Sequence, residues 1–297
     1  MRKTGGPEVL TVEDVMLAPL QAGEVRLRAL ASAVNHSDLQ IRAGNWPIRR
    51  DPKFPYVPGL EVVGDVIEVA SGVESVRVGD LVWTMMQGLG GVRAERDGGY
   101  AEHVTVAASV LAPLPKDTDP VAFAALGLAG VTAYEGLRRL GNLTGRTAII
   151  TGPSGGVGSI AIMLARAAGA HVVGLERGAP PPDAKSADAV LDVIAGVLFP
   201  SLIASLRPGG RYCLVGAVGG GEVQFDAWSL LDSLTLTGYS TEDLDGGDLH
   251  AATRALLELK LPSVERTVIP LEEAARAHEL LETRQVKGRI VLVPSRS

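Results

Sequence analysis

The segment 146–177 constrains the fold more than any other part of the chain. It contains two short apolar runs, 148–150 and 171–175, with an apolar helical segment between them at 160–168. Glycines bound the first run and follow the end of the helical segment. Buried parallel strands have short apolar runs of this kind, and a helix between two strands joins parallel neighbours. The segment therefore predicts one unit of a parallel α/β sheet.

Three glycines, Gly152, Gly155 and Gly158, follow the first run at three-residue spacing. Glycine permits a tight turn, lets the backbone approach a pyrophosphate, and lets the helix pack close to the sheet. The helix N-terminus offers free N–H groups and a partial positive charge to that anion. Glu176 ends the second strand, where a carboxylate accepts hydrogen bonds from a ribose diol. These features predict a dinucleotide-binding unit; a glycine-rich turn that binds no nucleotide is the alternative.

Composition limits the classes of partner. The net charge of −6 without a basic run argues against nucleic acid or an anionic membrane surface. An aromatic content of 4% argues against a surface that stacks single-stranded bases. The sequence shows neither a signal peptide nor a long uncharged apolar segment, which predicts a soluble cytoplasmic protein. The single cysteine, Cys213, excludes an internal disulfide and a cysteine-built zinc cluster, and we interpret it as a small buried residue.

The pattern of predicted secondary structure changes twice along the chain. Short strands separated by Gly, Pro and Asp dominate the N-terminal third, and strands alternating with helices follow. The last 40 residues return to a strand–helix–strand pattern. We therefore predict a β-rich domain at 1–117, a nucleotide-binding domain at 118–257, and a C-terminal segment at 258–297 that folds back onto the first domain.

Seven motifs, spread over nearly the whole chain, are specific in combination. They are GGPEVL (5–10), AVNHSDLQIRAG (33–44), FPYVPGLEVVGDV (54–66), VRVGDLV (76–82), GGYAEHV (98–104), LAGVTAYEGL (128–137) and LRPGGRY (206–212). This set resembles the medium-chain dehydrogenase/reductase superfamily, in its zinc-independent quinone oxidoreductase branch. The resemblance implies an α/β protein in which a GroES-like β-rich catalytic domain stands beside a Rossmann domain. It also implies hydride transfer from NADPH or NADH to a quinone or to an activated C=C bond of an enone or enoyl substrate.

The resemblance assigns cofactor contacts residue by residue. Asn35, in the Asn-x-x-Asp motif, and Thr132, in the GVTAY motif, resemble residues near the nicotinamide, although Thr132 is alternatively a helical threonine bonded to a backbone carbonyl. Asp38 is expected to order the loop and cap the following segment. The candidate cofactor-binding residues are Asn35, Thr132, Gly152, Ser154, Gly155, Gly156, Val157, Gly158, Glu176, Arg177, Val193, Ile194, Gly216, Ala217 and Val218.

No residue stands out as a proton donor. Trp46 occupies the place where related enoyl reductases often carry a tyrosine, and an indole N–H is no practical acid. A quinone can take its proton from water. The candidate catalytic residues are Asn35, His36 and Tyr56, with a solvated loop histidine as the alternative for His36. The candidate substrate pocket consists of Trp46, Tyr56, Met85 and Met86.

Zinc is not expected. Zinc-dependent relatives carry Gly-His-Glu where this chain has Gly59-Leu60-Glu61, and leucine offers no lone pair. No cysteine lies near 35–37, where another ligand would be, and the cysteines of a structural zinc loop are absent from the sequence. His36 and Glu61 alone cannot complete a tetrahedral site.

The nucleotide-binding domain is short. After Glu176-Arg177 only Gly178–Asp188 precedes the next expected strand at 189–194, so roughly one helix–strand–helix unit of the family is missing. In the usual strand order 3-2-1-4-5-6 the third strand lies at an edge, so its loss leaves the core intact. The missing unit normally walls the adenine side of the cofactor site, and weak, altered or lost cofactor binding is expected. Glu176 favours a ribose 2′-OH and Arg177 a 2′-phosphate, unless the two form an ion pair or are both exposed.

Two further expectations complete the interpretation. The last strand of the nucleotide-binding sheet, 234–238, is expected to be a free edge that pairs across a two-fold axis in a homodimer. The alternative to an oxidoreductase is a redox-silent protein of the same fold that catalyses a cyclisation or elimination or binds a small apolar molecule, or else a regulatory protein without turnover.

Overall fold

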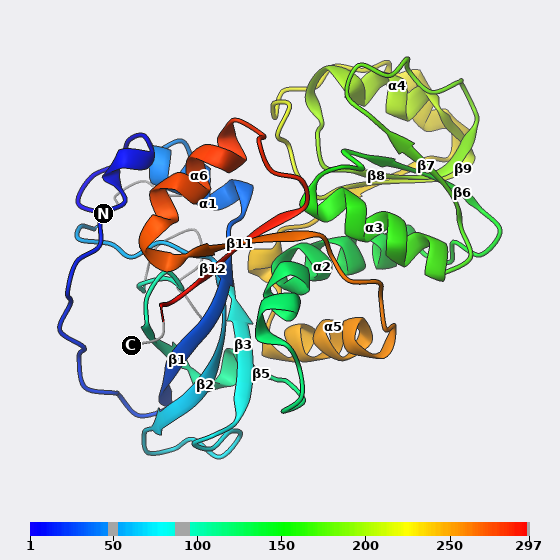
Figure 1. Ribbon diagram of the computed structural model, residues 1–297. Helices are drawn as coiled ribbons and strands as arrows, with labels where there is room; N and C mark the ends of the chain where they lie inside the picture. Colours follow the sequence, from blue (N-terminus) through cyan, green and yellow to red (C-terminus); the bar gives the residue numbers. More distant parts are fainter. Residues whose placement is uncertain (47–52, 87–95, 296–297) are drawn as a thin grey trace. The chain divides into compact units, whose positions relative to one another are not determined.

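The computed structural model describes residues 1–46, 53–86 and 96–295 (Figure 1). The chain forms two compact units. Unit 1 comprises Met1–Leu128, Leu244–Thr253 and Ser263–Ser297, and unit 2 comprises Ala129–Asp243 and Arg254–Pro262. Segments from both ends of the chain thus belong to unit 1.

Unit 1 contains a seven-stranded sheet with the order β11-β12-β1-β2-β3-β5, and β4 also pairs with β1. The strands are β1 (Glu24–Ala33), β2 (Glu61–Val69), β3 (Leu81–Met85), β4 (His103–Ala107), β5 (Ala112–Pro113), β11 (Arg266–Pro270) and β12 (Arg289–Val293). Strand β1 pairs antiparallel with β2, β4 and β12, so the C-terminal segment completes the N-terminal sheet. Its core is rich in valine, including Val25, Val62, Val66 and Val106.

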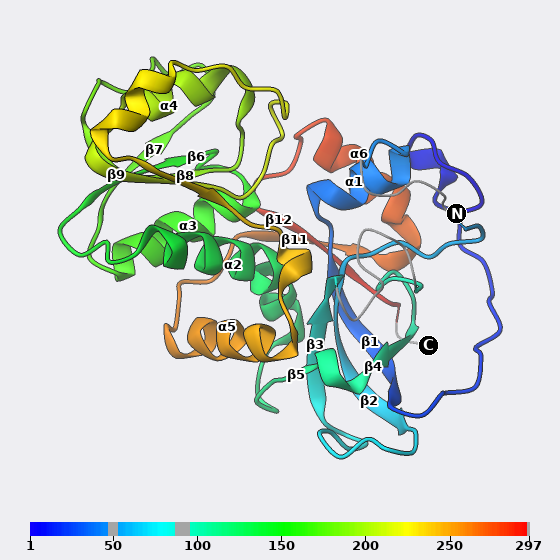
Figure 2. The same cartoon turned by 180° about the vertical axis from the view of Figure 1, so that it is seen from behind.

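Two helices cover one end of this sheet. Helix α1 (His36–Ala43) and helix α6 (Ala274–Glu282) contact each other, and α6 also packs on β11 and β12 (Figure 2). Leu39 of α1, Ala277 of α6 and Leu292 of β12 share a second apolar core. Short 3₁₀ helices, η1 (Pro7–Val9), η4 (Ala108–Val110) and η8 (Leu271–Glu273), also belong to unit 1.

Unit 2 contains a five-stranded parallel sheet with the order β10-β9-β8-β6-β7. The strands are β6 (Thr147–Thr151), β7 (His171–Leu175), β8 (Ala187–Asp192), β9 (Leu206–Leu214) and β10 (Thr235–Gly238). This is the Rossmann order with its third strand absent, so β7 and β10 are the two edges. The predicted architecture, a β-rich domain and a shortened Rossmann domain, is confirmed.

Helix α3 (Gly156–Ala167) contacts β6 and β7, and helix α4 (Phe199–Ala204) contacts β9 on the opposite face of the sheet (Figure 1). Unit 2 also contains the 3₁₀ helices η5 (Gly196–Leu198), η6 (Ala227–Asp232) and η7 (Thr241–Asp243). Strand β9 begins at Leu206, earlier than the glycines at 209–210 suggest, because Leu206 pairs with Ala187 and Arg211 pairs with Ala189. The residues between these two pairs form a bulge, which glycine tolerates.

Helix α2 (Pro120–Leu140) and helix α5 (Gly246–Glu258) complete the described structure. Within the described ranges α2 is long and apolar enough to cross a membrane by length and composition alone. However, 72% of its apolar window is buried inside the protein, as is typical of a core helix. The helix has non-helical backbone angles at Gly127, where it kinks.

The exposed edge of unit 2 gives a matched pair of valines. Val173 of β7 is 48% exposed, whereas Val190 of β8 is 0% exposed. We expect Val190→Ala to lower the free energy of unfolding by about 2 kcal/mol, because it leaves a cavity in the core. Val173→Ala should lower it by less than about 1 kcal/mol. Thermal unfolding of the two variants measures the difference, and equal losses would contradict an exposed β7.

Candidate functional site

The sequence-predicted cofactor residues of unit 2, apart from Thr132, lie at the carboxyl-terminal end of its strands, which we call the ligand-binding edge of the sheet. Loops leave the carboxyl ends of β6, β7, β8 and β9, and these ends meet at one edge because the strands are parallel. The residues that the structure brings there are Gly152, Ser154, Gly155, Gly156, Val157, Gly158, Glu176, Arg177, Val193, Ile194, Gly216, Ala217 and Val218. From β6 the chain moves to β7 on one side, and β8 lies on the other. This change of direction is where open α/β sheets bind ligands.

The glycine turn has the geometry of an anion cradle. Gly155 caps the N-terminus of α3, and its amide donates to the carbonyl of Gly152 at 2.9 Å. A Cβ at Gly158 would lie 2.1 Å from that same carbonyl oxygen, so only glycine permits this approach of helix to strand. The first helical bond runs from the amide of Ser159 to Gly155.

The amides of the first helical turn are therefore available to a ligand. Among the described residues, the N–H groups of Gly156, Val157 and Gly158 have no hydrogen-bond acceptor. Three N–H groups at the positive end of a helix dipole stabilise a phosphate group. The residues present thus fit the pyrophosphate of a dinucleotide.

A buried carboxylate, missed in the sequence interpretation, organises the neighbouring loop. Asp192, at the end of β8, is 0% exposed and accepts hydrogen bonds from Thr151 Oγ1 at 2.7 Å and Tyr212 Oη at 2.6 Å. It also accepts from the backbone amides of Ile194 at 2.8 Å and Ala195 at 3.1 Å. The signal in the sequence was an acid that ends an apolar strand. Because four donors hold it, Asp192 fixes the course of the chain after β8.

The loops after β8 and β9 are joined by backbone hydrogen bonds. The amide of Val215 donates to the carbonyl of Asp192, and the amide of Gly219 donates to the carbonyl of Ile194, both at 2.8 Å. This pairing keeps 193–194 next to 216–218. The two loops present apolar side chains, including Val218, which is 57% exposed.

The acid and base that follow β7 are both exposed, and the part of the chain that is described shows no ion pair between them. The contact recorded for Glu176 joins its Oε2 to Ser154 Oγ in the glycine turn, at 3.5 Å. Of the alternatives for Glu176 and Arg177, exposure of both is therefore the one observed.

Thr132 lies in the half of α2 that belongs to unit 2, and its side chain is buried. Its carbonyl accepts a hydrogen bond from Tyr239 Oη at 2.6 Å. The ring of Tyr239 lies under the guanidinium of Arg139, 4.1 Å from it. The role of Thr132 near a nicotinamide stays a prediction.

Unit 1 contains a buried polar cluster around Glu61. Its Oε1 accepts from Asn35 Nδ2 at 2.9 Å and lies 3.3 Å from Arg289 Nη2, and its Oε2 accepts from the amide of Leu128 at 2.9 Å. Arg289 Nη2 also donates to Asn35 Oδ1 at 2.8 Å. Each of these side chains is at most 8% exposed. The carboxylate thus connects β2, the start of α1, α2 and β12.

The kink in α2 makes one of these bonds possible. At Gly127 the helical backbone is interrupted, which frees the amide of Leu128 for Glu61. A Cβ at Gly127 would lie 2.2 Å from Glu61 Oε2, so glycine is needed for the close approach.

A second chain of polar groups adjoins this cluster. Arg42 Nη1 lies 3.3 Å from His278 Nδ1, and His278 Nε2 lies 3.2 Å from Tyr100 Oη. A guanidinium only donates, so Nδ1 is the acceptor and Nε2 carries the hydrogen. Arg42 also pairs with Glu282. His278 is thereby held in one neutral tautomer.

Burial shifts the pKa values of these groups. It raises the pKa of Asp38 to about 7, although the bond from the amide of Asn35 opposes the shift. It also raises the pKa of Glu61, against the opposing charge of Arg289. Burial and the charge of Arg42 lower the pKa of His278 to about 3.

The candidate catalytic residues differ in their surroundings. The side chain of Asn35 is engaged at both ends: its oxygen accepts from Arg289, and its nitrogen donates to Glu61 and also lies 3.3 Å from the carbonyl of Ala33. The expectation that Asp38 caps the segment after it is wrong in position, because α1 already begins at His36 and Asn35 is its N-cap. Asp38 is the third residue of the helix and accepts from the amide of Asn35 at 2.8 Å. His36 is an exposed residue at the start of α1. Its pKa is lowered, mainly because part of its ring is buried and to a smaller extent because of the positive charge of Arg284. Tyr56 is buried, and its backbone pairs with Met1.

The candidate substrate-pocket residues are mostly buried. Met85 pairs with Glu61 in the β2–β3 ladder, and the amide of Met86 donates to the carbonyl of Leu60 at 2.8 Å. Trp46 is half-buried, and its indole Nε1 is buried with no acceptor among the described residues.

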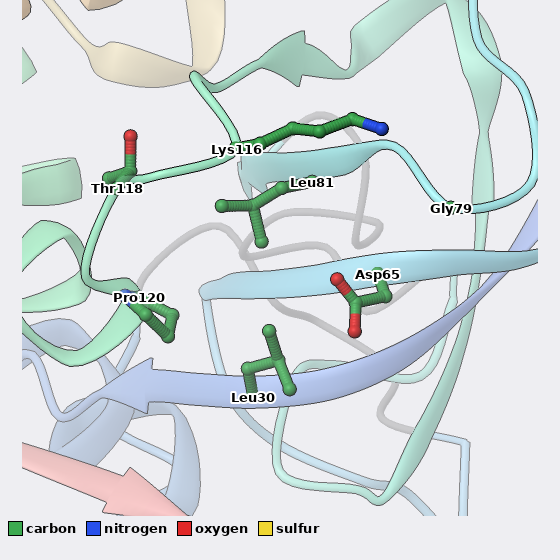
Figure 3. A pocket seen from close by; sticks show the side chains of 7 residues that line it. All are labelled: Leu30, Asp65, Gly79, Leu81, Lys116, Thr118 and Pro120. Atoms are coloured by element: carbon green, nitrogen blue, oxygen red, sulfur yellow. The ribbon is translucent and has the colours of Figure 1, made fainter.

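A small pocket elsewhere in unit 1 contains none of these candidates. It has a volume of 240 Å³ and lies beside β1, β2 and the segment that precedes α2 (Figure 3). Its lining residues are Leu30, Asp65, Gly79, Leu81, Lys116, Thr118 and Pro120.

The residues near Glu61 do not fit a catalytic zinc ion. Leu60 stands where a ligand would be needed, and the oxygens of Glu61 are engaged by Arg289, Asn35 and Leu128. In the described ranges no group of three or more His, Cys, Asp or Glu side chains is arranged to hold a metal ion.

Comparison with known proteins identifies the family. Residues 21–116 match the alcohol dehydrogenase GroES-like domain, and residues 169–292 match the zinc-binding dehydrogenase family. The quinone oxidoreductase of Sus scrofa is 30% identical over 326 positions, which cover 98% of this chain and 95% of that protein. The chain belongs to the quinone oxidoreductase family of medium-chain dehydrogenases/reductases. The alignment is longer than the 297 residues of the chain, so this relative carries segments that the present family member lacks.

Solved structures of the family agree with this assignment. Escherichia coli quinone oxidoreductase, solved with NADPH, has a TM-score of 0.85 at 26% identity and covers 99% of this chain and 98% of its own. A mycobacterial protein complexed with NADPH has a TM-score of 0.83 at 28% identity, with the same coverage. An alcohol dehydrogenase of Geobacillus stearothermophilus is 38% identical over 190 residues, which span 57% of this chain and 55% of that enzyme.

Asp38 and His278 are expected to give opposite pH dependences of stability. With a folded pKa of about 7, Asp38 binds a proton that the unfolded chain has released, so its contribution falls as pH rises from about 4 to about 7. With a folded pKa of about 3, His278 contributes stability that rises with pH up to about 6.5. Between about pH 4 and about pH 6.5, the free energy of unfolding of Asp38→Asn should rise relative to that of the unsubstituted protein by roughly 1 kcal/mol per pH unit. For His278→Gln the same difference should fall by a comparable amount per pH unit. Urea unfolding at several pH values measures both variants. Equal pH dependences of the free energy of unfolding in the two variants and the unsubstituted protein would refute the assignment.

Proposed function

We propose that this chain is a zinc-independent NAD(P)H-dependent oxidoreductase that reduces a quinone or an activated C=C bond of an enone or enoyl substrate. The observation that carries the proposal is the unpaired amide cluster of Gly156, Val157 and Gly158 at the switch point of the sheet. A bound dihydronicotinamide supplies the hydride. Relatives solved with NADPH support the choice of cofactor class.

The chain's own residues bind and orient the cofactor and exclude water from it. The amides at 156–158 hold the pyrophosphate, and Asp192 holds the loop that carries Val193 and Ile194. Together with Ala217 and Val218 these residues form the apolar side of the cofactor site. Glu176 and Arg177 are both exposed at the end of β7, so the proposal leaves the choice between a ribose 2′-OH and a 2′-phosphate open.

Substrate recognition and proton supply need little from the protein. The indole N–H of Trp46, which has no acceptor in the described part of the chain, is a suitable donor to a carbonyl oxygen of a quinone or enone. Asn35, His36 and Tyr56 stay the candidate catalytic residues, and a reduced quinone can take its proton from water. Zinc independence is supported by Leu60 and by the engagement of Glu61 with Arg289.

The shortened sheet favours a second candidate function. A protein that has lost cofactor binding would use the same fold for a cyclisation, an elimination or the binding of a small apolar molecule. Cofactor titration separates the two functions.

A substitution in the glycine turn tests the cofactor site. A Cβ at Gly155 would meet only the carbonyl of Gly152, at 3.3 Å, so Gly155→Val should fold but block the pyrophosphate. In the presence of a metal chelator, NADPH or NADH at about 100 times its dissociation constant should stabilise the unsubstituted protein by about 2.7 kcal/mol. We expect Gly155→Val to lose this effect and Ala167→Val, at the exposed far end of α3, to keep it. Thermal unfolding is the measurement, and no response at millimolar cofactor would favour the second candidate.

We also propose a homodimer built on the free edge β10. Three exposed apolar side chains precede this strand in η6, namely Trp228 (76% exposed), Leu230 (40%) and Leu231 (73%). Exposed apolar surface next to an unpaired strand is typical of an association site. We expect light scattering to report a dimer that Leu231→Asp converts to a monomer. Val173→Asp, on the opposite sheet edge, should leave the mass unchanged, and a monomeric unsubstituted protein would contradict the proposal.

A further inference from the structure

The sheet of unit 2 is asymmetric about its ligand-binding edge. A Rossmann sheet consists of two mononucleotide-binding halves of three strands each. Here the half formed by β8, β9 and β10 is complete, whereas the half formed by β6 and β7 lacks its third strand and the helices on either side of that strand. One half of a dinucleotide therefore loses its wall while the other keeps it.

We propose that this site recognises its cofactor as a mononucleotide: it binds the nicotinamide ribose phosphate and leaves the adenosine in solvent. The inference rests on the proposed function. Reduced nicotinamide mononucleotide should then bind nearly as well as NADH or NADPH.

The first observation is the exposure of β7. Val173 is 48% exposed and Gly174 is also exposed, although β7 would lie inside a sheet of full width. Glu176 and Arg177 at its end are exposed as well. A ligand that passed this edge would meet solvent instead of a protein wall.

The second observation is the path of the chain after β7. A turn forms in which the amide of Ala179 donates to the carbonyl of Glu176 at 3.2 Å. The chain then runs to the amino-terminal end of the strands, where the amide of Lys185 donates to the carbonyl of Ala204 and the amide of Ala187 donates to the carbonyl of Ser205. The connection between β7 and β8 thus leaves the ligand-binding edge almost at once and does not replace the missing wall.

The third observation is that the complete half is rigidly built. Asp192 accepts four hydrogen bonds, and the loops after β8 and β9 are joined at Val215 and Gly219. The anion cradle at 156–158 serves either half, because a single phosphate suffices for a helix N-terminus. Binding free energy therefore concentrates on the phosphate and nicotinamide riboside.

Calorimetric titration of the full chain with four ligands tests the inference. The ligands are reduced nicotinamide mononucleotide, NADH, NADPH and AMP. We expect the dissociation constant of the mononucleotide to lie within about tenfold of those of NADH and NADPH, and AMP to bind at least about 100-fold more weakly than the mononucleotide. Gly155→Val should abolish binding of all nicotinamide ligands, whereas Arg177→Ala should change the constant for the mononucleotide by less than about twofold.

Results that would overturn the inference fall into two kinds, which can be distinguished. If NADH or NADPH binds more than about tenfold more tightly than the mononucleotide, or if AMP binds less than about 100-fold more weakly than the mononucleotide, the adenosine is recognised. The inference then fails while the proposed function stands. If none of the nicotinamide ligands binds, both fail together.

Discussion

Unit 1 depends on the buried pair of Glu61 and Arg289. A buried carboxylate is costly unless its oxygens are satisfied, and removal of one partner of such a pair typically costs about 3–5 kcal/mol. The carboxylate belongs to β2, and its bonds reach three segments that are far from it in the sequence: the start of α1, the kink of α2 and β12. The cost of burying Glu61 is therefore offset only when all four segments are in place, which ties the C-terminal segment to the N-terminal sheet.

Unit 2 uses the same device at a different place. Asp192 is fully buried at the end of β8 and is satisfied by two hydroxyl groups and two backbone amides. Where Glu61 joins distant segments, Asp192 shapes a single loop at the edge that carries the glycine turn. Rigidity at this edge is a condition for binding, because a preorganised site pays less ordering entropy when a ligand arrives.

The sequence predicted the architecture well because the signals involved are local. Apolar runs, the glycine spacing at 152–158 and the short connection after Glu176 sufficed for the parallel sheet and its missing strand. The polar clusters were not predicted, because they depend on contacts between distant residues. Arg289 is visible in the sequence only as a charge at the start of an apolar run. Nothing local in the sequence joins His278 to Arg42 or Tyr100.

The bulge of β9 went unpredicted for a related reason. Pro208 and two glycines are usually signs of a loop, and only the pairing of Leu206 with Ala187 shows that the strand has already begun. Local turn signals therefore located the irregularity correctly but not the strand that contains it.

The loss of a strand also changes what the rest of the sheet shows to other molecules. On the side away from β6, strand β7 carries backbone N–H and C=O groups that no other described strand pairs, and such a row is a template for β-augmentation by an extended peptide. Two features limit this hazard. The strand is only five residues long, and a run of prolines follows it, which cannot continue a hydrogen-bonded ladder.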